Sequence, residues 1–403
     1  MSVKFKDISS FLSLIFLISA VSLDISFGVT GLKLGNLFLI SSCLLIVILG
    51  ARSATNTPVA VKFGVSDKFY LLFVLVVVVS SAWSPSPVNA LFQATVMILL
   101  WCASLLLVNI ELEKFVKQFI NIALVVAIFS LFLMPIAPSI AFQPSPSGTM
   151  PELRGIFHHQ LRFGLYMGMA LGFLILIKLN HERDKFFKSE LTYYLTSFVI
   201  FTALILSFAR LYSLFTVLAI GLVILFSGRG RFKYFALVIL VSIVSVLLVF
   251  EQDLLFWLEG MGIDTTLTGR VRIWVKTLEL ASDGSFWGYG FASFDSHLFD
   301  RIWGIYRPAH AHNSFIQAYF ELGVVGLIVL ITLVISHFRD IYMKDKSPSK
   351  YSYAGFVFFL TVLGSLTGAN YASKPTLIFS VMMVLIVLER NKSSLIGVGL
   401  RGK

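Results

Sequence analysis

Arginine and histidine residues recur in four short segments whose side chains could do chemistry together. The arginines are Arg154, Arg162, Arg210, Arg270 and Arg272, and the histidines are His158, His159, His310 and His312. An arginine guanidinium stays charged at physiological pH and pairs with two phosphate oxygens at once. A histidine can accept a proton near neutral pH. The combination predicts group transfer on a phosphate-linked substrate.

Metal-assisted chemistry is not expected from these segments. They contain no Asp-x-Asp pair, and Asp295, His297 and Asp300 lack the spacing of a ligand set. Cys43 and Cys102 both lie within apolar runs, which argues against a zinc site or a disulfide framework. We therefore expect a catalytic site with no metal and no cofactor.

The composition places these segments in a membrane protein. Of the 403 residues, 57% are hydrophobic and only 13% are charged, against about 25% charged in soluble domains. The mean hydropathy is +0.89. These values exclude a soluble enzyme, a secreted disulfide scaffold and a disordered protein. The net charge of +11 would suggest a nucleic-acid partner in a soluble protein, but basic cytoplasmic loops explain it here.

Twelve stretches are candidates for membrane-spanning helices, each of which needs about 20 residues. They are 8–28, 32–50, 68–83, 90–110, 115–141, 161–179, 191–209, 211–227, 232–250, 314–337, 353–372 and 375–389. An even number places both termini on one side of the membrane, and about two thirds of the 32 Lys and Arg residues then lie on that side. Because basic residues accumulate in cytoplasmic loops, both termini are predicted to be cytoplasmic. The first stretch is expected to be an uncleaved span.

Two outer segments are large enough to carry chemistry, 143–160 and 251–313. The second segment divides the chain into three predicted regions. Residues 1–250 contain the first nine membrane-spanning helices, 251–313 form a periplasmic loop domain, and 314–403 contain the last three helices and a cytoplasmic tail. Within this loop, an amphipathic helix is predicted after the candidate N-cap Thr268. Its apolar face is formed by Val271, Trp274, Val275 and Leu278. Gly288-Tyr289-Gly290 then marks a turn.

Several motifs resemble those of the O-antigen ligase and Wzy-type O-antigen polymerase superfamily. The segment HNSFIQAYFELGVVGL, from His312 to Leu327, is similar to the family's His-Asn pair followed by Glu-x-Gly-x-x-Gly. LTGRVRIW and WGYG resemble its Gly-Arg and Gly-x-Gly segments, and SFARLYS and RGIFHHQLRFG its other two motifs. Leu161 and Leu211 stand where the family has Asn and a small residue, respectively.

The resemblance implies a fold and a set of residue roles. The fold would be an all-α polytopic membrane protein of the GT-C-like type, in the bacterial inner membrane, with one large periplasmic loop. His312 would be the general base, and Arg270 and Arg210 would bind the diphosphate. The remaining residues predicted to bind substrate are Arg154, His159, Arg162 and Asn313.

Each role has a structural alternative. His312 could be a helix cap, and Arg270 could be a solvated charge. For His159, Arg154 and Arg162, contact with lipid headgroups is as well supported as a place in the site. Other motif residues are read as structural: Glu321 as a hydrogen-bonding residue, Gly323 and Gly326 as sites of close packing, and Trp274 and Trp287 as membrane anchors.

The implied activity is transfer of a glycan from undecaprenyl diphosphate to a sugar hydroxyl. The acceptor would be lipid A–core for a ligase or another lipid-linked glycan for a polymerase. The Arg- and His-rich outer segments favour the ligase slightly, because they would suit a phosphorylated core. A protein O-oligosaccharyltransferase and a lipid-glycan transporter remain alternatives. A transporter predicts ionisable groups near the membrane midplane and internal symmetry, and the sequence shows neither. Membrane lipids are the remaining expected partner.

Overall fold

The computed structural model describes residues 5–23, 34–54, 62–144, 151–227, 234, 270–283, 286–296, 308, 310–343, 351–371 and 375–399. The first half of the described chain contains α1 (Phe5–Ser22), α2 (Leu34–Ala54), α3 (Val65–Ser80), α4 (Pro87–Leu106), η1 (Leu107–Asn109), α5 (Leu112–Ile136), α6 (Pro138–Ala141), β1 (Phe142–Gln143), β2 (Glu152–Leu153), α7 (Gln160–Leu179) and α8 (Arg183–Phe186). The second half contains α9 (Glu190–Leu206), α10 (Arg210–Phe226), α13 (Arg270–Asp283), η2 (Ser293–Asp295), α15 (Ser314–Tyr342), α16 (Tyr353–Ser365) and α17 (Leu377–Gly399).

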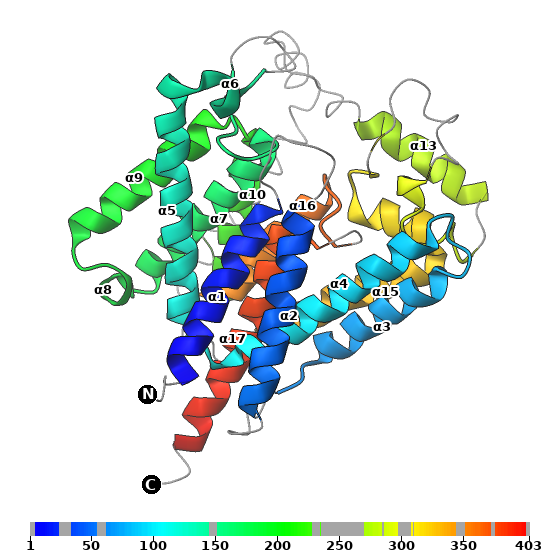
Figure 1. The fold of residues 1–403 in the computed structure, drawn as a ribbon, viewed down its shortest axis with the longest axis horizontal. Helices are drawn as coiled ribbons and strands as arrows, with labels where there is room; N and C mark the ends of the chain where they lie inside the picture. The colour runs from blue at the N-terminus through cyan, green and yellow to red at the C-terminus, as the bar shows by residue number, and fades with distance from the viewer. Residues whose placement is uncertain are drawn as a thin grey trace.

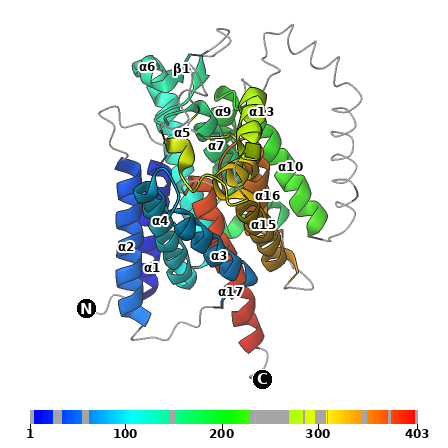
Figure 2. The same ribbon diagram turned by 90° about the vertical axis from the view of Figure 1, so that its right-hand side faces the viewer.

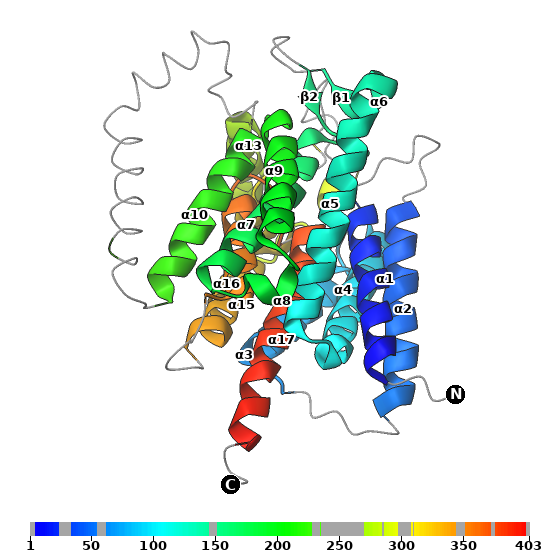
Figure 3. The ribbon, with the colours of Figure 1, turned by 90° about the vertical axis from the view of Figure 1, so that its left-hand side faces the viewer.

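The long helices form a bundle in which neighbours in space are often distant in sequence. α3 lies along α15, α10 along α16, and α4 along α2 (Figure 1). α5, α7 and α9 pack together on another side of the bundle (Figure 3). The start of α1 and the end of α17 lie at one end, whereas α6 and α13 lie toward the opposite end (Figures 1 and 2). The predicted cationic segments are therefore far from the chain ends.

The described helices have the length and composition of a polytopic membrane protein. Four are long and apolar enough to cross a membrane: Pro87–Asn109, Leu112–Ile136, Gln160–Leu179 and Ser314–Tyr342. Ser9–Ser22, Asn36–Gly50, Glu190–Leu206, Arg210–Phe226 and Tyr353–Ser365 are shorter apolar helices. Large apolar side chains also point outward, including Val125 of α5 and Phe198 of α9, which are 66% and 67% exposed. Such an apolar outer surface suits lipid rather than water.

A helix is present at every predicted span except 232–250, which lies outside the described residues apart from Tyr234. The number of spans remains a prediction, since four helices meet the length criterion. The bounds of several helices differ from the sequence prediction. The predicted span 353–372 is helical only to Ser365, and α17 continues past 389 to Gly399. A two-stranded antiparallel ladder, with Phe142 opposite Leu153, also departs from the all-α prediction.

α15 is broken at Gly323, which has φ 66° and ψ −161°. At this break the loop that follows α13 docks its backbone onto the helix. Val324 N–H donates to the Phe286 carbonyl at 3.0 Å, and Tyr289 N–H donates to the Phe320 carbonyl at 3.1 Å. A side chain at 323 would collide with the Phe286 carbonyl. The sequence analysis predicts that Gly323 permits close packing. It does, and the segment that approaches it is the backbone of a loop rather than another helix.

A buried charge cluster joins three helices near the chain ends. Arg390 of α17 pairs with Asp67 of α3 at 2.6 Å and lies 3.6 Å from Asp340 of α15. Trp101 Nε1–H donates to Asp67 at 3.0 Å, and the Ser66 hydroxyl donates to Asp340 at 2.6 Å. The Arg390 side chain is 2% exposed. The guanidinium is buried because α17 continues past residue 389, and the two carboxylates compensate its charge.

Candidate functional site

The first part of the site is the turn between β2 and α7. His159 caps α7, because its Nδ1 accepts a hydrogen bond from Leu161 N–H at 3.2 Å. In the neutral ring the proton must then be on Nε2, which lies 3.5 Å from the Gln143 amide nitrogen. Burial and the positive charges of Arg162, Arg270 and Arg154 lower the pKa of His159 to about 4. The ring is therefore neutral at neutral pH.

Arg154 has a structural role in this turn. Its Nε donates to the Ile140 carbonyl at 3.1 Å and its Nη2 to the Ser139 carbonyl at 3.2 Å. Both carbonyls belong to α6, so the guanidinium ties the β2 turn to the end of that short helix. Its predicted role in substrate binding remains untested.

Arg270 is the first described residue of α13 and points into the protein. It is 9% exposed, and burial lowers its pKa. Ile273, Thr277 and Ala281 share this buried face, with exposures of 8% or less. Among the described residues no carboxylate pairs with Arg270. A buried cation without a compensating anion is unfavourable, so this position suits an anionic ligand.

The predicted apolar face of the same helix points the other way. Val271, Val275 and Leu278 are 45%, 51% and 43% exposed, and Trp274 is partly buried. The helix is amphipathic as predicted. However, the face that packs on the described residues contains Arg270 rather than the valines. The candidate N-cap Thr268 lies outside the described residues.

His312 lies at the entrance to α15 in an unusual backbone conformation, with φ 54°. Its N–H donates to His310 Nδ1 at 3.1 Å, and the two rings are 4.1 Å apart between centroids. Burial and the charges of Arg270 and Arg162, with a contribution from His159, lower the pKa of His312 to about 4. His312 is thus neutral at neutral pH, with a nitrogen able to accept a proton.

Asn313, not His312, caps α15. Its Oδ1 accepts from Phe315 N–H at 2.9 Å and from Ile316 N–H at 3.1 Å. Its Nδ2 donates to the Leu366 carbonyl at 3.2 Å. The amide of Asn313 is therefore engaged on both sides, and its predicted contact with substrate remains a prediction. This geometry excludes the alternative that His312 serves as the cap.

Buried hydrogen bonds link the peptide before His312 to the interior of α15. Ala311 N–H donates to Gln317 Oε1 at 3.2 Å, and Gln317 Nε2 donates to Glu321 Oε1 at 3.3 Å. The same carboxylate oxygen accepts from Phe294 N–H at 3.4 Å. Glu321 therefore has the predicted structural role. Gln317 was missed by the sequence analysis, although it lies one helical turn before Glu321.

The structure brings four of the predicted residues into one electrostatic group. His159, Arg162, Arg270 and His312 come from three separate segments, and the charges of the two arginines shift the pKa values of both histidines. Arg210 is exposed at the start of α10 and is not among the charges that shift them. Its place in the site remains a prediction.

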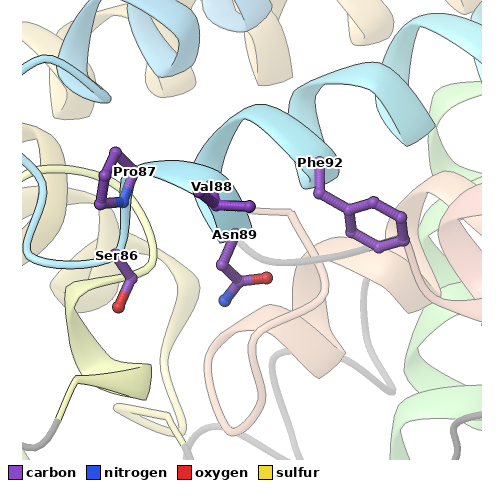
Figure 4. A pocket seen from close by; sticks show the side chains of 5 residues that line it. All are labelled: Ser86, Pro87, Val88, Asn89 and Phe92. Atoms are coloured by element: carbon purple, nitrogen blue, oxygen red, sulfur yellow. The ribbon is translucent and has the colours of Figure 1, made fainter.

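The described residues also include an open pocket, but no candidate metal site. An open pocket lies at the start of α4, lined by Ser86, Pro87, Val88, Asn89 and Phe92, none of which is a predicted site residue (Figure 4). Within the described ranges, no group of three or more His, Cys, Asp or Glu side chains could hold a metal ion. The Arg270 and His312 region is therefore the best candidate.

Fold and site together define a polytopic helical membrane protein with a buried cationic and histidine-containing site at one end. Residues 195–331 match the family model described as O-antigen ligase. This segment contains Arg210, Arg270, His312 and Asn313, whereas Arg154, His159 and Arg162 precede it. The predicted resemblance to the O-antigen ligase and Wzy-type polymerase superfamily is confirmed by this match, which covers residues 195–331.

The chain is also similar to the exopolysaccharide production protein ExoQ of Rhizobium meliloti (strain 1021). The two are 29% identical over 119 residues, which is 27% of this chain and 27% of ExoQ. The match thus spans about a quarter of that relative's length. It supports the superfamily without identifying the substrates of this chain.

Proposed function

We propose that the protein transfers a glycan from an undecaprenyl diphosphate carrier to a sugar hydroxyl, as an O-antigen ligase or polymerase. The observation that carries the proposal is Arg270, a buried cation beside His312 with no carboxylate partner in the described structure. A diphosphate supplies the missing negative charge and is also the leaving group. Arg162 adds a second positive charge to the same region.

In the proposed reaction, His312 and Arg270 have separate roles. The acceptor hydroxyl attacks the anomeric carbon as His312 takes its proton, and the bond from that carbon to the diphosphate oxygen breaks. The departing electron pair stays on the diphosphate, where fixed positive charge stabilises it. A single displacement of this kind inverts the anomeric configuration.

The bound donor also prepares the base. In the free protein, nearby arginine charges help to keep the pKa of His312 near 4. A diphosphate offsets these charges, so its binding raises the pKa of His312 toward the ordinary value. His312 therefore becomes a stronger base only when the donor is present.

The acceptor distinguishes an O-antigen ligase from an O-antigen polymerase. The family model is named for the ligase, whereas the relative is named for exopolysaccharide production, which favours a polymerase. Analysis of the surface glycans of a deletion strain separates them. Bare lipid A–core with accumulated lipid-linked polymer indicates a ligase. Core carrying a single repeat, or lipid-linked single repeats without polymer, indicates a polymerase.

The proposal is tested with purified protein in detergent and a radiolabelled lipid-linked glycan isolated from the deletion strain. Transfer of the label to the acceptor is the expected result. Because detergent removes the barrier between two compartments, a transporter would give no product. Label appearing on a serine or threonine of a protein would instead indicate an O-oligosaccharyltransferase.

A further inference from the structure

The backbone at His312 has a conformation that few residues other than glycine adopt. Its φ of 54° lies in the left-handed region, which is unfavourable for a side chain with a Cβ. Such a conformation persists only where the surrounding structure holds it in place. The contacts of the neighbouring peptides therefore determine where the His312 ring points.

Three side chains hold the backbone around His312. Asn313 caps the helix that follows, and His310 Nδ1 accepts from the His312 N–H at 3.1 Å. Gln317 Oε1 accepts from the Ala311 N–H at 3.2 Å. Gln317 is the most buried of the three at 4% exposed, and Ala311 is 0% exposed. The peptide before His312 is thus fixed from the interior of α15.

The Gln317 amide is in turn held by Glu321. Gln317 Nε2 donates to Glu321 Oε1 at 3.3 Å, and the Phe294 N–H donates to the same oxygen at 3.4 Å. Because one end of the amide faces a backbone N–H and the other faces a carboxylate, only one orientation satisfies both contacts. Glu321 therefore keeps the Gln317 oxygen turned toward Ala311.

We propose that Gln317 is the positioning residue for His312, an inference that rests on the proposed function. Gln317 acts through the Ala311 peptide, which sets the path of the backbone into His312 and so the direction of the ring. A general base must lie within hydrogen-bond reach of the proton that it removes. A displaced ring therefore slows transfer without loosening the diphosphate at Arg270.

The first test compares Gln317→Leu with Gln118→Leu in the purified full chain. Leucine is similar in size to glutamine but cannot accept from the Ala311 N–H. Gln118 is the matched control, because both ends of its amide are also bonded, to Ser13 at 2.6 Å and to Ser10 at 2.9 Å. These contacts lie in the first half of α1, near the chain end and far from α13 (Figure 1).

We expect kcat per folded protein to fall about ten- to a hundredfold in Gln317→Leu, which is part of the contribution of a general base. KM for the lipid-linked glycan and inhibition by undecaprenyl diphosphate should stay near their wild-type values. Gln118→Leu should retain the wild-type kcat.

A double-mutant cycle separates positioning from a purely structural role. A residue that acts through His312 has no effect on the rate once that ring is absent. Gln317→Leu should therefore slow single-turnover transfer no further in the His312→Ala background. A structural residue would lower the rate in both backgrounds.

An exchanged pair tests the direction of the hydrogen bonds. In the double variant Gln317→Glu/Glu321→Gln, the new carboxylate can accept from the Ala311 N–H and from the new amide. The oxygen of that amide can accept from the Phe294 N–H. The pair should recover most of the lost kcat, whereas Gln317→Glu alone places two carboxylates together and should not.

Four results would overturn the positioning role. They are an unchanged kcat in Gln317→Leu, an equal loss in Gln118→Leu, a further loss in the His312→Ala background, or weakened inhibition by undecaprenyl diphosphate. Should Gln317→Leu not fold, the exchanged pair decides, and no recovery relative to Gln317→Glu would overturn the role.

Amide hydrogen exchange supplies a readout that does not require transfer. The segment with Ala311 and His312 should exchange faster in Gln317→Leu than in the wild type and in Gln118→Leu, because a buried N–H loses its acceptor. Unchanged exchange would overturn the connection itself. Faster exchange together with no transfer by the wild-type protein would overturn the proposed function, and with it the catalytic purpose of the connection.

Discussion

Two residues from distant parts of the chain, Arg270 and His312, have shared electrostatic surroundings but different chemical capacities. Arg270 is a buried cation that can hold an anion, and His312 is a neutral ring that can accept a proton. The positive charge of the first lowers the pKa of the second. The two roles can therefore be separated experimentally.

Replacement of His312 and of Arg270 by alanine should impair different steps. A general base contributes about 10²–10⁴-fold to the rate, so His312→Ala should lower turnover and leave donor binding nearly intact. A hydrogen bond to a charged group contributes about 1.5–3 kcal/mol, so Arg270→Ala should weaken donor binding tenfold or more. Arg270→Lys should restore it only in part. Donor affinity and single-turnover rates test this, and poor donor binding with normal turnover in His312→Ala would reverse the assignment.

The pH dependence should reflect the low pKa of His312. Since the pKa of its ring is about 4 in the free protein, kcat/KM should stay level from pH 7 to about pH 5 and fall below that. The inflection in kcat should lie at higher pH, because bound diphosphate raises the pKa. Arg270→Gln should move the kcat/KM inflection upward by removing a positive charge. An inflection near pH 6.5 in the wild-type kcat/KM would show that the free site does not hold His312 neutral in this way.

The lowered histidine pKa values also make the free energy of unfolding decrease at acidic pH. The ordinary histidine pKa of about 6.5 is lowered for both His159 and His312, so the unfolded chain binds protons more readily than the folded one. Their contribution is fully present above pH 6.5 and decreases as the pH falls from there toward 4. Acidification therefore disfavours the folded site.

At the scale of elements, the break in α15 joins the loop after α13 to the helix that carries His312. The left-handed backbone at Gly323 permits the loop carbonyl of Phe286 to approach the helix. Two backbone hydrogen bonds then hold the loop in place. This contact, together with packing of α13 on α15, fixes Arg270 relative to His312.

Gly323→Ala should weaken this connection. The φ of 66° and ψ of −161° are accessible almost only to glycine, and such strain costs about 1–3 kcal/mol in addition to the collision with Phe286. We expect a lower melting temperature in detergent and reduced transfer. Gly50→Ala is the control, since residue 50 lies within regular helix. Wild-type stability and activity in Gly323→Ala would show that the break does not position the loop.

The Arg390 cluster has a purely structural consequence. Removing one partner of a buried ion pair leaves an uncompensated charge and costs about 3–5 kcal/mol. Arg390→Ala should therefore destabilise the protein by about this amount, measured by thermal or denaturant unfolding in detergent. Arg183→Ala is the control, because its pairs with Asp184 and Glu190 are exposed. Equal effects of the two substitutions would contradict the structural importance of the cluster.

At the scale of the whole molecule, the position of the site relative to the chain ends determines the topology. The start of α1 and the end of α17 lie at one end of the bundle, and α13 lies toward the other (Figure 1). If the site faces the periplasm, both termini must face the cytoplasm. The Lys and Arg distribution in the sequence gives the same orientation.

Reporter fusions test this topology. A reporter after Lys403 should be active only as a cytoplasmic enzyme, and one inserted near Asp283 only as a periplasmic enzyme. Matched fusions with alkaline phosphatase and green fluorescent protein distinguish the two sides. A periplasmic C-terminus would contradict the predicted even number of spans and the orientation of the site.

The sequence by itself determined the membrane class, because long apolar runs have few alternatives to helices in a bilayer. It also determined which residue types could bind diphosphate and accept a proton, and the motifs around Arg270 and His312 were sufficient to recognise the superfamily. These conclusions depend on residues close together in the chain. The helices at the predicted spans follow for the same reason.

The tertiary structure decided features that depend on contacts between distant segments. The apolar face of α13 gave no indication that Arg270 would be buried and Val275 exposed, because orientation depends on what the helix packs against. The burial of Arg390 depends on carboxylates from two other helices. Sequence patterns report the polarity of each segment, whereas only the packed chain shows which polar groups meet.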